Sequence, residues 1–174
     1  REILKTAKNK NFYTYGINKN SNFQIKNISQ KINFSCFDIK INIPGNKKII
    51  KNIKVPLIGI HNIKNVTSAV AVAFSIGISE KIIKKGLMEF KGVQRRFSYL
   101  FKHNNSIFID DYAHHPTEIS SVLEGVNEVY NKKEVICVFQ PHRISRVKSL
   151  KMEFSKCFKK ADTVLLCPIY KANE

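Results

Sequence analysis

The sequence contains no Trp and only two Met, and none of its apolar runs reaches the roughly 18 residues that a membrane-spanning helix requires. An integral membrane protein is therefore excluded. The glycine-rich patterns GxxxxGK(S/T) and GxGxxG, which cradle phosphate on backbone N–H groups, are absent as well. The chain thus has no recognisable phosphate cradle of its own, and any nucleotide chemistry needs other residues.

Four cysteines, Cys36, Cys137, Cys157 and Cys167, are too far apart in sequence for a zinc knuckle or a redox pair. Three of them lie among apolar residues, so we expect small buried side chains and a reducing, cytoplasmic compartment. The chain begins with Arg1, and no signal peptide follows it. We therefore expect a fragment of a longer protein.

Acidic residues are scarce, because 13 Asp and Glu face 30 Lys and Arg, which gives a net charge of +17 at pH 7. A basic module that binds nucleic acid is one interpretation of this balance. Lys is scattered, however, in a chain also crowded with Ile and Asn, and A/T-rich codons produce that combination without a selected partner. We therefore expect no nucleic-acid partner. The few arginines include two pairs, Arg95/Arg96 and Arg143/Arg146, whose fork geometry suits phosphate or carboxylate.

The first part of the chain, to about residue 58, alternates short β-type runs with Asn, Gly and Lys. The predicted strands are Phe12–Tyr15, Phe23–Ile28, Ile32–Ile43 and Ile49–Val55, with a turn at residues 44–46. From Asn65 onward the small apolar run NVTSAVAVAFSIGI predicts a helix packed deep against this sheet, which Gly77 ends. Ser79 can cap a second helix, Glu80–Phe90.

A break at Lys91-Gly92-Val93 predicts a domain boundary, with one domain over 1–91 and another over 92–174. In the second part, Pro116 and Glu118 favour the start of a helix. The predicted order is strands at 96–102 and 107–110, a helix at 116 to about 130, a buried strand at 135–139, a loop at 141–146, a helix around 150–160 and a strand at 163–168. This alternation predicts an α/β fold with a parallel, doubly wound sheet.

Two polar clusters follow predicted strands of the second part, at the ends where open α/β sheets bind ligands. The sequence DDYAHHP (110–116) follows one strand, and QPHRISR (140–146) follows another. Neighbouring parallel strands would bring both clusters to one edge, where imidazole and guanidinium groups suit carboxylate or phosphate. Turn capping by Asp110 and Asp111 is the alternative, but two clusters at equivalent ends favour a site. The Asp and His spacing matches no standard metal motif, so no metal ligand is assigned.

Two further segments contain candidate ligands. The amides of Asn62 and Asn65 can donate to and accept from a purine edge, although helix capping by Asn62 is the simpler interpretation. Gln94-Arg95-Arg96-Phe97 lies at the predicted boundary, where an Arg can reach a ligand held between domains. A solvated charge pair is the alternative there.

Taken together, these residues resemble the Mur ligase family of peptidoglycan synthesis. The matching motifs are, in order, GIHNIKNVTSAVAVAFSIGI (59–78), GVQRRF (92–97), IDDYAHHPTEI (109–119), FQPHRISR (139–146) and, more loosely, ADTVLLCPIYKANE (161–174). The resemblance implies the end of a central ATP-binding α/β domain over 1–91, followed by an incomplete Rossmann-like C-terminal domain over 92–174. It also implies that the P-loop, the central Mg²⁺-binding acid and the UDP-sugar domain lie outside the chain. The fragment alone is then expected to be inactive.

Within the family, DDYAHHPTE and FQPHR are most similar to members that join L-alanine to the lactyl carboxylate of UDP-N-acetylmuramate. The resemblance implies that ATP activates that carboxylate as an acyl phosphate, with Mg²⁺, and that UDP-N-acetylmuramate and L-alanine are the substrates. A family member that recycles murein tripeptide is the alternative, and a basic nucleic-acid module is a distant third.

The resemblance also implies roles for individual residues. Asn62 and Asn65 would recognise adenine, with His61 beside them. Arg96 would reach the terminal phosphate, and Asp110 or Asp111 would face the nucleotide. The amino-acid and acyl-phosphate region would be lined by Tyr112, His114, His142, Arg143 and Arg146. The expected catalytic residues are Arg96, His114 and Arg143, and Arg143 or Arg146 would hold the carboxylate of L-alanine because an Arg fork matches it.

Two departures from the family pattern stand out. Ile144-Ser145 replaces the usual Tyr-Thr, which keeps a hydroxyl at Ser145 but removes any hydrogen bond that the phenol would make at position 144. Asn173 replaces a usual Gly, which is a mild change because Asn tolerates left-handed backbone best after Gly.

Overall fold

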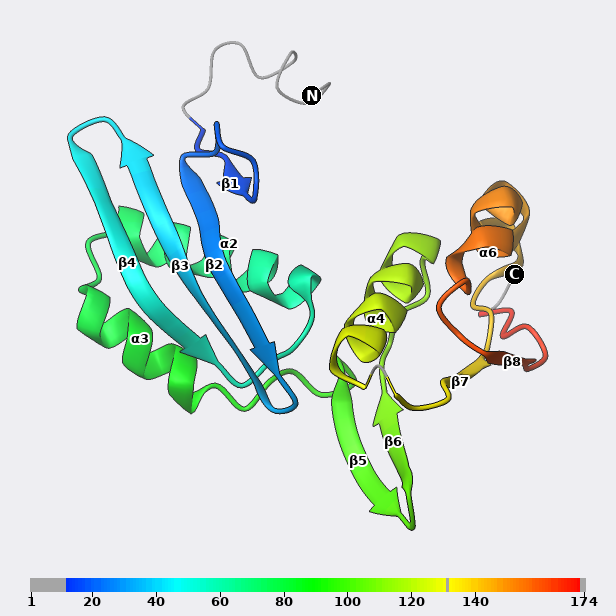
Figure 1. Ribbon diagram of the computed structural model, residues 1–174. Helices are drawn as coiled ribbons and strands as arrows, with labels where there is room; N and C mark the ends of the chain where they lie inside the picture. Colours follow the sequence, from blue (N-terminus) through cyan, green and yellow to red (C-terminus); the bar gives the residue numbers. More distant parts are fainter. Residues whose placement is uncertain (1–11, 131, 173–174) are drawn as a thin grey trace.

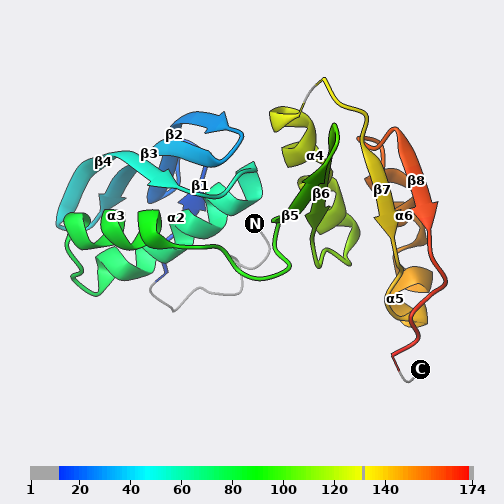
Figure 2. The ribbon, with the colours of Figure 1, turned by 90° about the horizontal axis from the view of Figure 1, so that it is seen from below.

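The computed structural model describes residues 12–130 and 132–172, so Arg1 and Asn173 lie outside the described residues. The first part is a four-stranded sheet with two helices on one face (Figures 1 and 2). The strands are β1 (Tyr15–Gly16), β2 (Phe23–Lys31), β3 (Phe34–Ile43) and β4 (Asn46–Val55), in the order β1-β2-β3-β4. β2, β3 and β4 pair antiparallel, and β1 pairs parallel to β2.

The two helices of this part are α2 (Ile60–Ser75) and α3 (Glu80–Glu89). They cover the sheet face from which alternate strand residues such as Phe23, Phe37, Ile39 and Ile53 form the buried core. Burying this apolar surface is the main force that holds helix and sheet together. The three predicted strands from Phe23 onward correspond to β2, β3 and β4, although β2 ends three residues later and β4 begins three residues earlier than predicted. Only the last residue of the predicted strand Phe12–Tyr15 belongs to β1.

The helix predicted from Asn65 onward begins earlier, at Ile60, with Gly59 as its N-cap at φ 90°. This backbone conformation favours glycine, and it sets the helix start before the Asn residues. The helix is also less deeply packed than predicted. One stripe that includes Ile63 and Val70 is buried, but Val72 and Ile76 are exposed because only the side that faces the sheet is covered among the described residues. Gly77, at φ 86°, follows the helix as expected.

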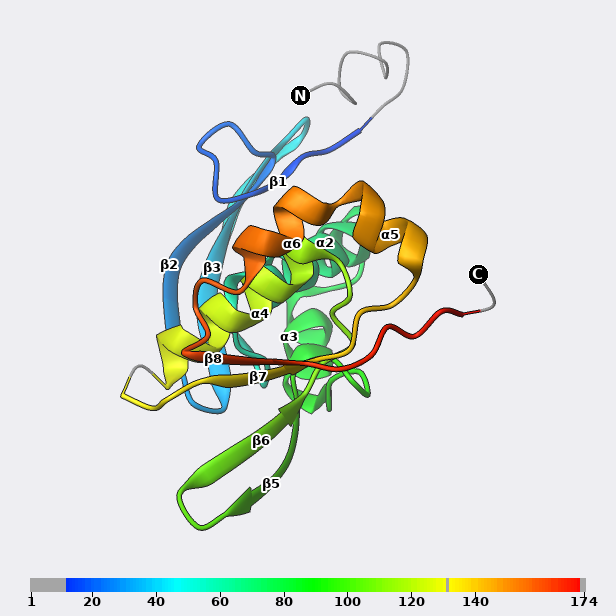
Figure 3. The same cartoon turned by 90° about the vertical axis from the view of Figure 1, so that its right-hand side faces the viewer.

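The second part begins with an antiparallel hairpin, β5 (Ser98–His103) and β6 (Ser106–Asp110). Helix α4 (Pro116–Val129) follows, and β7 (Ile136–Phe139) leads to short helices α5 (Ile144–Ser149) and α6 (Lys151–Cys157) and to β8 (Thr163–Leu166). β7 and β8 pair in parallel. Figure 3 shows α4 and α6 on the same side of this pair, where Ile119, Leu123, Phe139 and Phe154 form a second core.

Three expectations for the second part need correction. Within the described residues the β5–β6 hairpin and the parallel β7–β8 pair are separate sheets, so no continuous parallel sheet is formed. The strand at 135–139 is buried on one face only, because Ile136 and Val138 are exposed. The predicted loop 141–146 becomes helical at Ile144, because Arg143, at φ 68°, turns the chain into α5.

No helix in residues 12–130 and 132–172 is long and apolar enough to cross a membrane. The four cysteines are unpaired, and Cys157 is buried in the second core. Burial raises the pKa of the Cys137 thiol and raises that of Cys157 to about 11. Of the three cysteines expected to be buried, only Cys157 is, because Cys137 and Cys167 are partly exposed.

The two parts meet where α4 crosses the start of α2. A Cβ atom placed on Gly125 of α4 would lie 3.3 Å from the Gly59 Cα atom and 3.8 Å from the Phe97 ring. The Gly59 N–H group donates to Gln30 Oε1 at 2.6 Å, which fixes that backbone from the sheet side. A side chain at position 125 would therefore push against backbone that cannot easily move.

We predict that Gly125→Ala lowers the free energy of unfolding by about 1–3 kcal/mol, because overpacking outweighs the gain in helix propensity. Gly86→Ala is the matched control, since Gly86 lies in α3 and a Cβ atom there would meet no other element within 4 Å. That change should stabilise the protein by about 0.5–1 kcal/mol. Urea unfolding of the two variants measures the difference, and equal stabilisation by both would show that the α2–α4 crossing is not tightly packed.

Candidate functional site

The start of α2 places the two candidate adenine ligands in different environments. Asn62 is buried, and its Nδ2 donates to the Ile58 carbonyl at 2.8 Å, whereas Asn65 is exposed. Asn62 is therefore not the N-cap, because the helix begins at Ile60 and the side chain donates a hydrogen bond to a carbonyl instead of accepting one from an N–H group. The amide oxygen of Asn62 takes no part in this contact, and Asn65 lies about one helical turn further along α2.

His61 is directed toward α4. Burial lowers the pKa of its imidazole, although the nearby Asp111 carboxylate opposes this effect. The His61 Nδ1 atom is buried and is without a hydrogen-bond partner in the part of the chain that the structure describes. A Cβ on Gly59 would lie 2.7 Å from His61 Cε1, so the ring lies against the glycine. His61 thus lies between the two parts of the chain, beside the predicted site.

Asp111 joins the two loops that contain the QRRF and DDYAHHP motifs. Its Oδ2 accepts from the Phe97 N–H group and its Oδ1 from the Ala113 N–H group, both at 2.7 Å. The Tyr112 N–H group donates to the Arg95 carbonyl at 2.8 Å, which adds a second link between the loops, whereas the bond from Ala113 lies within one of them. Arg95 and Phe97 have φ values of 58° and 51°, which are unfavourable for such residues and persist where surrounding contacts enforce them.

The paired arginines have different partners. Arg95 Nε lies 3.3 Å from Asp110 Oδ2, and its guanidinium carbon lies 4.8 Å from the centre of the Tyr112 ring. Arg96 Nη1 lies 3.8 Å from Glu118 Oε1, and its side chain is 52% exposed. Pairs this exposed contribute little to stability, so the Arg96 guanidinium remains accessible to a ligand.

The two strand-end clusters meet, as the sequence predicted. The His114 and His142 rings have centroids 6.0 Å apart, although β6 and β7 do not pair. Tyr112 packs edge-on against His114 at 5.1 Å. On the other side Tyr170, which sequence reasoning missed as a site residue, has its ring centroid 5.3 Å from that of His142. Its position just after β8, a third strand end, is the signal that could have identified it.

The hydrogen bonds of the two histidines fix complementary roles. His114 Nδ1 lies 2.9 Å from the Tyr112 carbonyl oxygen, which can only accept, so Nδ1 is the donor and Nε2 of the neutral ring is an acceptor. Arg146 Nη1 lies 3.4 Å from His142 Nδ1, and because Arg can only donate, His142 Nδ1 accepts and its Nε2 bears the proton. One edge of the molecule therefore presents a proton acceptor beside a donor.

The two arginines of the second pair, Arg143 and Arg146, also have different contacts. Arg146 Nη1 contacts the His142 ring and its carbonyl oxygen, at 3.3 Å for the latter, so this guanidinium orients His142. Arg143 is exposed, and its backbone N–H group donates to the Tyr170 carbonyl at 2.9 Å. That bond fixes the backbone from which the Arg143 side chain leaves.

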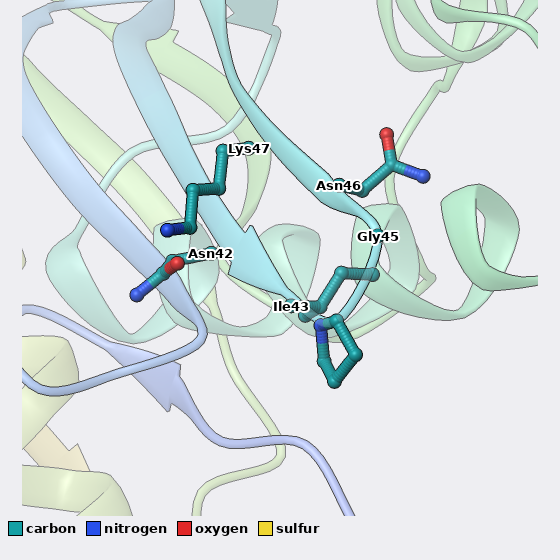
Figure 4. A pocket seen from close by; sticks show the side chains of 6 residues that line it. Asn42, Ile43, Gly45, Asn46 and Lys47 are labelled. Atoms are coloured by element: carbon teal, nitrogen blue, oxygen red, sulfur yellow. The ribbon is translucent and has the colours of Figure 1, made fainter.

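A shallow pocket lies elsewhere, at the turn between β3 and β4 (Figure 4). It includes none of the residues predicted for the site, and it lies at the end of β4 away from the start of α2. Its lining residues are Asn42, Ile43, Pro44, Gly45, Asn46 and Lys47. Nothing in this lining converges on a ligand, and the motif residues define the candidate site instead.

The contrast between the two Asn residues gives a prediction. Asn62→Ala should lower the free energy of unfolding by about 1 kcal/mol, because it leaves the buried Ile58 carbonyl without this donor. Asn65→Ala, at an exposed position of the same helix, should change it by less than about 0.5 kcal/mol. Chemical denaturation measures both, and an equal loss in the two variants would contradict the assigned environment of Asn62.

Comparison with known proteins agrees with the motifs. The model described as "Mur ligase middle domain" matches residues 1–73, and that described as "Mur ligase, glutamate ligase domain" matches residues 95–174. The UDP-N-acetylmuramate–L-alanine ligase of Pelagibacter ubique is 61% identical over 175 residues, which cover 100% of this chain and 38% of that protein. The ligase of the same name from Agrobacterium fabrum is 44% identical, over 92% of this chain and 34% of that protein.

The fold agrees with a solved structure as well. The crystal structure of UDP-N-acetylmuramate–alanine ligase from Thermotoga maritima superposes with a TM-score of 0.75 at 29% identity, over 91% of this chain and 34% of that chain. The chain therefore spans less than two fifths of the length of these relatives. With both of its parts matched in the expected order, the chain belongs to the Mur ligase family, and it comprises segments of the middle and C-terminal domains.

Proposed function

We propose that this chain is part of an ATP-dependent ligase that joins L-alanine to the lactyl carboxylate of UDP-N-acetylmuramate in peptidoglycan synthesis. The observation that supports this most is the contact between His114 and His142, with rings 6.0 Å apart, at one edge that Arg143 also borders. The names of the relatives and the five motifs favour the same reaction. We place the protein in the cytoplasm, where its substrates would be made. The proposal also includes the domain boundary near residue 92.

In the proposed reaction the lactyl carboxylate takes the terminal phosphoryl group of ATP. The amine of L-alanine then attacks the acyl phosphate, the amide bond forms, phosphate leaves, and the amine loses a proton. The side chains divide these tasks. Arg96 spreads the charge of the phosphoryl group, the Nε2 atom of His114 accepts the proton of the amine, and His142 donates to the oxyanion of the tetrahedral intermediate.

The adenine of ATP would lie at the start of α2, where the Asn62 oxygen supplies an acceptor and the exposed amide of Asn65 supplies both a donor and an acceptor. Asp110 or Asp111 would face the nucleotide; Asp110 pairs with the exposed Arg95, and Asp111 accepts from two backbone N–H groups. Within the described residues no group of three His, Cys, Asp or Glu side chains is arranged to hold a metal ion, and we derive no step through Mg²⁺.

For L-alanine, the different environments of the two candidate arginines support different roles. Arg146 is held against His142, whereas Arg143 is exposed at the end of β7. We therefore assign the carboxylate of the amino acid to Arg143 and the orientation of His142 to Arg146. The replacement of the family's usual Tyr by Ile144 removes neither guanidinium group. Ile144 is the first residue of α5, and Arg143 comes directly before it.

The experiment that tests the proposal measures phosphate release by the full-length gene product with ATP, Mg²⁺ and UDP-N-acetylmuramate. We expect release that depends on L-alanine. Release with murein tripeptide alone would assign the protein to cell-wall recycling and contradict the proposed acceptor. Release with neither, together with salt-sensitive binding to DNA, would favour the basic nucleic-acid module instead.

Two variants make the same assay specific for the acceptor site. Arg143→Lys should raise the KM for L-alanine roughly 10- to 100-fold, with little change in the KM for ATP, because Lys cannot pair bidentately with a carboxylate. Arg146→Lys is the matched control and should affect kcat more than the KM for L-alanine. The reverse pattern would exchange the roles of the two residues.

A further inference from the structure

Glu118 is a carboxylate to which the proposed reaction gives no functional role. It is the third residue of α4, and its Oε2 accepts from the N–H groups of His114 and His115, each at 3.2 Å. The Thr117 N–H group donates in return to His115 Nδ1 at 3.3 Å, which completes a capping box. A capping box needs only an acceptor at this position, so Gln would serve it as well as Glu.

The negative charge of Glu118 faces two other groups. Its Oε1 lies 3.8 Å from Arg96 Nη1, and its Oε2 lies 4.0 Å from His114 Nδ1. Burial alone would raise the pKa of Glu118, but the hydrogen bonds from the N–H groups of His114 and His115 and the charge of Arg96 oppose it, so its pKa lies below the usual value. The side chain is therefore ionised near neutral pH, between the phosphate-directed arginine and the acceptor-side histidine.

The direction of the Arg96 side chain has to be fixed by a partner, because its own backbone lies outside any helix or strand. It lies in a loop, between Arg95 and Phe97, which both have left-handed backbone. The neighbouring carboxylates are engaged elsewhere, Asp110 by Arg95 and Asp111 by backbone N–H groups. Among the described residues, Glu118 is the carboxylate that pairs with the Arg96 guanidinium.

We propose that Glu118 is a positioning residue of the ligase reaction, which holds the Arg96 guanidinium beside His114 so that both reach one acyl phosphate. This role rests on the proposed ligase function. The pair is too exposed to matter much for stability. Displacement of a group that contacts the transition state by about 1 Å can nevertheless slow a reaction about 100-fold. The expected signature is a loss of rate without a loss of stability.

The test compares three variants in the full-length gene product. Glu118→Gln keeps the capping acceptor and removes the charge, whereas Glu118→Ala removes both. Glu124→Gln is the matched control, because Glu124 is exposed on the same helix, where its Oε1 accepts from the Ser120 hydroxyl at 3.3 Å. We expect Glu118→Gln to lower kcat roughly tenfold or more, with the KM for L-alanine and the Tm nearly unchanged. Glu124→Gln should leave both kcat and Tm unchanged.

The partner of Glu118 is tested by combination with Arg96→Ala. If Glu118 acts through Arg96, Glu118→Gln should reduce kcat no further in the Arg96→Ala background. A full additional loss there would overturn the proposal. Wild-type kcat in Glu118→Gln, or equal losses of Tm in Glu118→Gln and Glu118→Ala, would overturn it as well, because Glu118 would then serve the capping box alone.

A measurement without substrate separates this proposal from the proposed function. In the full-length gene product without substrate, the ¹⁵N relaxation of Arg96 Nε should report a restrained side chain, and Glu118→Gln should make it as mobile as an exposed arginine. An unchanged, mobile Arg96 in both proteins would overturn the positioning role even if the ligase is active. A restrained Arg96 in an enzyme that does not use L-alanine would refute the function and leave the contact intact.

Discussion

The Asp111 carboxylate is the interaction on which the candidate site depends. It accepts two backbone N–H groups at 2.7 Å, from Phe97 and from Ala113, just beyond the end of the β5–β6 hairpin, where Ser98 pairs with Asp110. Hydrogen bonds to an ionised acceptor are about twice as strong as neutral ones, so they can offset the left-handed backbone of Arg95 and Phe97. With the two loops joined in this way, Arg96 projects from one of them toward Glu118 at the start of α4.

The second constraint is the crossing of α2 and α4. It fixes the residues proposed to bind the nucleotide relative to the residues proposed to bind L-alanine. Gly59 and Gly125 allow the two helices to approach closely, and Gln30 donates to Glu128 across the same junction while accepting from Gly59. His61 fills the space beside them. The glycine that starts α2 therefore does two things, because its backbone conformation begins the helix that presents Asn62 and its missing side chain admits α4.

Much of this arrangement could be predicted from the sequence, since strand ends of an α/β fold converge and the polar motifs follow those ends. That reasoning correctly placed His114 near His142, although through loops and not through a paired sheet. It failed where tertiary contacts decide. The start of α2 depends on a glycine in left-handed backbone, the helical turn after Arg143 depends on a hydrogen bond to Tyr170, and the second role of Glu118 depends on a loop distant in sequence.

The joining of the two loops by Asp111 is tested most directly by amide hydrogen exchange at Phe97 and Ala113, measured by NMR in the wild-type chain and in Asp111→Ala. We expect both amides to be protected in the wild type and to exchange roughly 10- to 100-fold faster in the variant, because a hydrogen bond to a charged group is lost. The Ile63 amide, which donates to the Gly59 carbonyl, should be unaffected. Equal exchange of the Phe97 amide in the two proteins would show that Asp111 does not hold the loops together.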